Sequence, residues 1–128
     1  MQDDSMETAI AATKAALGAL IDRPALSTKL LQRPPVRFIQ DVVIELHARA
    51  GFGAGVLSAD DMVPGSLRDR PAKLAFISKI HGHVQYVLNE PVHVQHSKVI
   101  AGLQVLHTNR FLQAMAAAAT ITVKESAK

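Results

Sequence analysis

Four basic side chains lie close together around a proline pair in the first third of the chain. They are Arg23, Lys29, Arg33 and Arg37, and the prolines are residues 34 and 35. The planar guanidinium of arginine can hold a carboxylate through two parallel hydrogen bonds, and clustered cations attract an acidic protein over a long range. The run therefore favours an acidic partner, although solvated charges on an ordinary surface would give the same pattern.

A second basic group lies near the start of a predicted long helix. It comprises Arg68, Arg70, Lys73 and Lys79. Positive charge at a helix N-terminus opposes the helix dipole at a small cost, which hints at a use for these residues beyond solubility. Solubility alone is the alternative. Whether the two groups share a face depends on the tertiary structure.

The histidines and glycines do not form a site for a metal or a nucleotide. His81 and His83 point about 200° apart on a helix, so they cannot share an ion. His93 and His96 could meet only if their loop turned helical, and no carboxylate stands at ligand spacing nearby. We therefore predict no metal, with His81 at the edge of the core holding a hydrogen bond. The glycines of 51–55 follow a predicted helix and lack nucleotide-binding spacing, so they predict a loop.

The sequence offers no candidate catalytic residues. No nucleophile elbow or pair of acids appears. The chain contains no cysteine, which excludes a disulfide, a thiolate nucleophile and a cysteine zinc site. We predict no enzymatic activity and no cofactor.

Length and composition fit one globular domain. The chain has 128 residues, of which 48% are hydrophobic and 20% charged, with a net charge of +3. That much apolar surface excludes an intrinsically disordered chain. The apolar stretch 9–21 spans only 13 residues and contains Lys14, so it fits neither a membrane span nor a signal peptide. We expect a soluble intracellular protein.

Apolar spacing predicts four main helices. The ranges are 6–21, 36–50, 69–89 and a last helix beginning at an N-cap Thr108. Arg23-Pro24 is expected to end the first helix, and the broad apolar band of the third predicts a central, heavily buried helix. Shorter helices are expected at 27–32 and 98–103. No strand pattern is convincing, so the fold class is all-α, with four main helices joined by loops that carry shorter ones.

The predicted helix 36–50 is amphipathic. One face carries an apolar stripe, and the other is expected to pair Arg37 with Asp41 and Glu45 with Arg49 at i,i+4 spacing. Gly51 is its predicted C-terminal cap. Residues 51–71 predict a loop with one helical turn. We place the domain at 1–123 and the start of a charged linker at 124–128.

Several segments, taken in order, resemble a known family. They are RPALSTKLLQRPPVRF (23–38), GF (51–52), DRPAKLAFISK (69–79), EP (90–91), VIAG (99–102) and TNRFLQ (108–113). Together they resemble the N-terminal calponin-homology domains of the intraflagellar transport protein fifty-four family, also called microtubule-interacting proteins associated with TRAF. The resemblance covers nearly the whole chain. One departure is Gly102-Leu103-Gln104-Val105, where the family has Gly-His-Glu-Pro.

The resemblance implies a calponin-homology fold that binds αβ-tubulin or microtubules. It also implies a subunit of the intraflagellar transport B complex, acting in cilium assembly and found in the cilium or flagellum, the basal body and the cytoplasm. Other subunits of that complex would bind regions outside this chain. The eight basic residues of the two groups are then the expected tubulin-binding surface.

Two other functions remain open. A scaffold module that binds another transport-train subunit is the first alternative, and an exposed apolar patch would favour it. Nucleic-acid binding is less expected, because the chain has only four Phe and one Tyr and the phenylalanines look core-facing.

Overall fold

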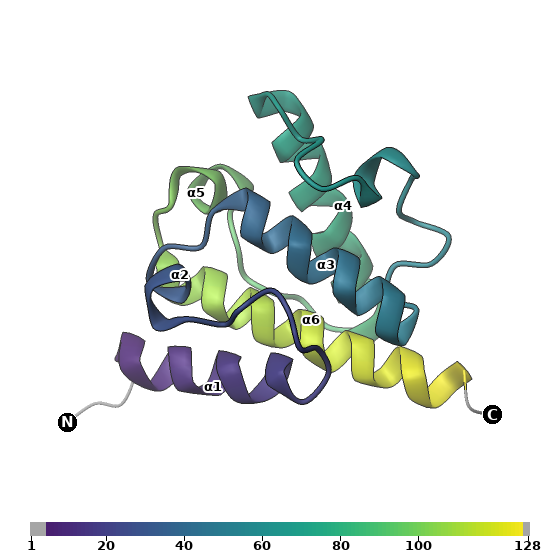
Figure 1. Cartoon of the computed structure of the whole chain (residues 1–128), viewed down its shortest axis with the longest axis horizontal. Coiled ribbons are helices and arrows are strands. Elements are labelled where there is room, and N and C mark those ends of the chain that lie inside the picture. The colour runs from purple at the N-terminus through teal and green to yellow at the C-terminus, as the bar shows by residue number, and fades with distance from the viewer. Residues whose placement is uncertain (1–4, 127–128) are drawn as a thin grey trace.

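Six α-helices and one 3-10 turn follow one another along the chain in the computed structural model, which describes residues 5–126. They are α1 (Met6–Gly18), α2 (Thr28–Gln32), α3 (Val36–Ala50), η1 (Asp60–Met62), α4 (Arg70–Leu88), α5 (His96–Ala101) and α6 (Val105–Ser126) (Figure 1). No residue in this described range lies in a strand. The prediction of an all-α fold is confirmed.

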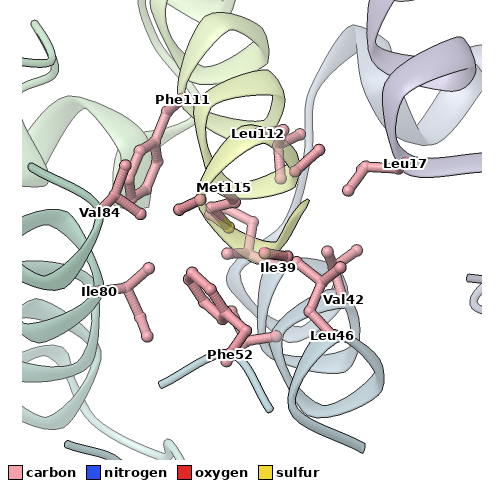
Figure 2. Close-up of a cluster of buried hydrophobic side chains, with 14 of the residues drawn as sticks. Leu17, Ile39, Val42, Leu46, Phe52, Ile80, Val84, Phe111, Leu112 and Met115 are labelled. Carbon is pink, nitrogen blue, oxygen red and sulfur yellow. The ribbon is translucent and has the colours of Figure 1, made fainter. Parts of the chain in front are cut away.

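The central element is α6. It contacts α1, α3 and α4, and Figure 1 shows it running beneath α3 and alongside α1. Its buried alanines, Ala116, Ala118 and Ala119, let neighbouring helices approach closely. Figure 2 shows side chains from α3, α4 and α6 converging around Phe52, which comes from the loop after α3.

The expectation that the 69–89 helix is central and heavily buried is wrong. In α4 the buried residues are Phe76, Ile77, Ile80 and Val84, and the rest are exposed or half-buried. Part of α4 stands away from the other helices in Figure 1. The apolar band was broad because α4 also packs against α5 and the loops, which bury side chains only in part.

The strongest amphipathic pattern is confirmed in α3. Its predicted bounds are correct, its apolar stripe is buried, and Gly51 caps it in the left-handed conformation with φ of 74°. The bounds of α4 also agree within a residue. Asp69 caps its first turn by accepting a hydrogen bond from the amide of Ala72 at 2.9 Å, and Asn89 closes its end with φ of 56°.

Two predicted boundaries of the main helices are wrong, and the short helix expected at 98–103 lies instead at His96–Ala101. The first helix ends at Gly18, not at residue 21, because glycine is a poor helix former and the amides of Leu20 and Ile21 both turn back to the carbonyl of Leu17. The last helix begins at Val105, so Thr108 is a buried residue inside it, not its N-cap.

The charged end of the chain is helical as far as it is described. Residues 124–126 form the last turn of α6, and the remaining two residues of the expected linker lie outside the described range. The domain boundary at 123 stays a prediction. Among residues 5–126, no helix has both the length and the apolar character that crossing a bilayer requires.

One predicted ion pair forms and the other does not. Arg37 Nε and Asp41 Oδ1 are 3.2 Å apart, as expected for i,i+4 spacing. Glu45 and Arg49 do not pair with each other. The segment after α1 packs beside α3, so Glu45 pairs with Arg23 at 3.2 Å and Arg49 pairs with Asp22 at 2.8 Å.

Candidate functional site

The eight predicted basic residues lie on five parts of the surface. Arg23 is in the segment between α1 and α2, Lys29 is on α2, and Arg33 caps the end of α2. Arg37 is in the first turn of α3 and Arg68 is in the loop before α4. The other three, Arg70, Lys73 and Lys79, are on α4. All eight are exposed or half-buried.

One residue of each basic group reaches a common groove. The groove has a volume of about 390 Å³ and lies between the start of α3, the loop before α4, α4 itself and α5. We call it the cationic groove, and its lining residues are Pro35, Val36, Arg37, Gln40, Gly65, Leu67, Lys73 and Ile100. The tertiary structure thus brings Arg37 of the first group and Lys73 of the second to one surface.

Arg33, at the end of α2, contacts the end of α5, where Ile100 lines the groove. Its Nη2 donates to the carbonyl oxygen of Ala101 at 3.3 Å. Its side chain also lies so close to Gly102 that a Cβ at that position would overlap it. Gly102 has φ of 72° and ends α5, so its left-handed conformation favours glycine. Arg33 therefore positions α5 as well as adding charge.

A buried amide fixes the loop that forms one wall of the groove. Gln40 on α3 is 1% exposed, and its Nε2 donates to the carbonyls of Asp61 and Val63 and to Ser66 Oγ at 3.0 to 3.1 Å. Its Oε1 accepts the amide of Gly65 at 3.1 Å. Gln40 could not be predicted from the sequence, because a single polar residue outside the apolar stripe gives no signal of this role.

Lys79 is already engaged inside the fold. Its Nζ lies 2.6 Å from Asp61 Oδ2; the Asp61 side chain is 12% exposed and that of Lys79 is 33% exposed. Burial alone would raise the pKa of Asp61, but hydrogen bonds from Lys79 and Ser58 outweigh it, so the pKa lies below the usual 3.8. A carboxylate that stays ionised keeps this pair intact. Lys79 is thus less free than the other predicted site residues to meet a partner.

Arg23 shares a second hollow with two carboxylates. The hollow, of about 220 Å³, is lined by Arg23, Pro24, Arg37, Asp41, Ile44, Glu45 and Pro64. Asp41 and Glu45 pair with the two arginines. The charges on this side of Arg37 are therefore largely balanced.

The expected hydrogen bond of His81 is confirmed. Its Nε2 lies 2.6 Å from the carbonyl of Val92, and its Nδ1 lies 2.9 Å from His96 Nε2. The partner of His96 is therefore His81 and not its sequence neighbour His93. In residues 5–126 no three histidine, aspartate or glutamate side chains gather as metal ligands would.

The all-α fold is that of a calponin-homology-like domain. Residues 9–121 match the family described as the microtubule-binding protein MIP-T3 CH-like domain. This match covers most of the chain, and the chain belongs to that family.

Curated relatives agree with this assignment. The chain is 35% identical to TRAF3-interacting protein 1 of Rattus norvegicus and to that of Mus musculus. Each alignment spans 101 residues, or 79% of this chain. It is 33% identical over 104 residues, or 81% of the chain, to TRAF3-interacting protein 1 of Danio rerio. The aligned region spans 16% of the length of each relative. The resemblance found in the sequence is confirmed.

Proposed function

We propose that this domain binds αβ-tubulin through a basic surface centred on the cationic groove, as a non-enzymatic module. The observation that carries the proposal is the convergence of Arg37 and Lys73 on one groove in a member of a microtubule-binding domain family. Tubulin is an acidic protein, so clustered cations raise the rate of encounter and select against basic partners. Arg68, which directly follows Leu67 of the groove, and Arg70 in the first turn of α4 add positive charge on the Lys73 side.

We further propose that the domain serves a subunit of the intraflagellar transport B complex in cilium assembly. The relatives carry several times more chain than the aligned domain, which leaves room for contacts with other subunits elsewhere. The domain would then act at the cilium or flagellum, the basal body and the cytoskeleton.

The test is titration of purified αβ-tubulin dimer into the 128-residue chain at low and moderate salt. The informative variant is the double change Arg68→Glu and Lys73→Glu, since neither side chain makes an ion pair among the described residues. The matched control is Lys14→Glu with Lys124→Glu, which changes the net charge equally on α1 and at the end of α6. Circular dichroism checks that both variants remain helical.

We expect binding that weakens with salt, a loss of about tenfold or more in the test variant, and a change of about twofold or less in the control. Equal losses in both variants would mean that total charge, not this surface, governs binding. Absence of wild-type binding at low salt would reject the tubulin proposal and leave a scaffold module as the better account.

A further inference from the structure

Three neighbouring hollows lie on the basic surface, and they differ in charge. The hollow beside Arg23 also contains Asp41 and Glu45. The hollow between the loop 58–68 and α4 contains Arg68 and Lys79, together with Asp60 and Asp61. The cationic groove contains Arg37 and Lys73 and is lined by no acidic residue. Of these three, the cationic groove is the one whose positive charge has no carboxylate among its lining residues.

The guanidinium of Arg37 retains donors for a ligand. Its Nε donates to Asp41, but this pair is exposed at the surface and contributes little. Its Nη1 lies over Gly65 at the groove, so close that a Cβ on Gly65 would be 3.2 Å away. The two Nη groups together carry four N–H bonds. Arg37 can therefore keep its intrahelical pair and still donate to an incoming carboxylate.

Lys73, on α4, contributes the second positive charge of the groove beside Arg37 of α3. Its side chain is half-buried on α4, and its ammonium makes no ion pair among residues 5–126. Water screens the attraction between a carboxylate and a half-buried cation less than it screens the attraction to a fully solvated cation. Lys73 therefore gains more interaction energy from a carboxylate than a fully exposed lysine would.

The lining of the groove includes the apolar side chains of Val36, Leu67 and Ile100, which we call its apolar floor. Val36 is buried, and the partly buried side chains of Leu67 and Ile100 pack against the core beside it. A ligand made only of charge would leave this floor in contact with water. A ligand that carries an apolar side chain next to its carboxylate would cover it.

We propose that the cationic groove binds a single extended acidic peptide segment. One glutamate or aspartate carboxylate lies between Arg37 and Lys73, and a neighbouring apolar side chain of the same segment packs on Val36, Leu67 and Ile100. The inference rests on the proposed function, since such a segment would belong to the acidic partner. An extended segment fits because a groove of about 390 Å³ admits one or two side chains, whereas a flat folded surface would span it without filling it.

The experiment is a titration of the isotope-labelled 128-residue chain with the blocked peptide Glu-Glu-Leu-Glu-Glu at low salt, followed by NMR. We expect the amide signals of Gly65, Leu67 and Lys73 to shift most. The peptide Glu-Glu-Ser-Glu-Glu should bind about threefold more weakly, because serine cannot cover the apolar floor. Lys73→Gln should weaken binding about fivefold or more, and Lys14→Gln should change it by less than about twofold.

Two results would overturn the inference. One is the absence of shifts at the groove, and the other is an equal effect of the two glutamine variants. A different result is that the peptide does not bind while the wild-type chain still binds tubulin and the double charge reversal still weakens tubulin binding. In that case the peptide subsite alone is wrong, and the proposed function stands. If the wild-type chain binds neither peptide nor tubulin, the proposed function fails with it.

Discussion

The hydroxyl of Thr13 donates to the side-chain oxygen of Asn109 at 2.8 Å, joining α1 to α6 across 96 residues of sequence. Both side chains are fully buried. The amide of Asn109 donates in turn to the carbonyl of Leu31 at 2.8 Å, so the pair also fixes the end of α2. A polar contact inside an apolar core specifies one arrangement of these three segments, because any other would leave polar atoms unpaired.

Thr13→Val should destabilise the domain by about 1 to 3 kcal/mol, because the side chain keeps its shape while Asn109 loses a buried donor. The control is Thr120→Val, whose hydroxyl only donates to the carbonyl of Ala116 within α6. That change should cost about 0.5 kcal/mol or less. Urea unfolding gives both values, and equal losses would contradict the role of the buried pair.

Replacing glycine by alanine should have opposite effects at two positions. At Gly51, with φ of 74° and no atom closer than 3.8 Å to an added Cβ, the cost is conformational and should be about 1 kcal/mol. At Gly82, inside α4 with open space around it, alanine should stabilise by about 0.5 to 1 kcal/mol. Thermal unfolding measures both, and a shift of the same sign at both positions would contradict the assigned conformations.

Asp61→Asn should cost about 1 to 3 kcal/mol at neutral pH, since it leaves the half-buried ammonium of Lys79 without its counter-ion. Asp41→Asn is the control, because its partner Arg37 is 60% exposed and the pair contributes about 0.5 kcal/mol or less. The lowered pKa of Asp61 means that its contribution is present above the usual 3.8 and is lost as the pH falls through the folded-state value. The difference in the free energy of unfolding between Asp61→Asn and wild type, measured with urea, should therefore shrink in acid. A difference that stays constant with pH would contradict this.

Stability should also fall as the pH drops below about 6.5, the usual histidine pKa. Burial lowers the pKa of His83. The pKa of His96 is also lowered, mainly by burial and to a smaller extent by the nearby His81. The unfolded chain then binds protons first, so the free energy of unfolding decreases between the ordinary pKa and the folded values.

His83 gives this effect a structural cause that can be tested. Its Nε2 accepts the amide of Gly53 at 3.2 Å, which a protonated ring cannot do. His83→Gln offers an uncharged acceptor at the same place, so its unfolding free energy should change less between about pH 7 and about pH 5 than that of wild type. An unchanged slope would show that His83 makes no contribution.

Much of the helical framework could be predicted because it follows from local physics. Apolar spacing and capping residues gave the bounds of α3 and, within a residue, those of α4. The start of the first helix at Met6 was predicted correctly, but its end and the start of the last helix were not. Gly18 ended one early, and the left-handed turn at Gln104, with φ of 51°, allowed the other to start before Thr108.

The sequence by itself determined the all-α class, the family and the two basic groups, because composition, periodicity and motif spacing are properties of the linear chain. Only the tertiary structure decided which of these charges meet. Ion pairs with Asp61 and Glu45 engage Lys79 and Arg23, since folding brings these partners within 2.6 and 3.2 Å. The groove that joins Arg37 to Lys73 depends on an irregular loop, and hydrogen bonds from distant Gln40, not local spacing, hold that loop in place.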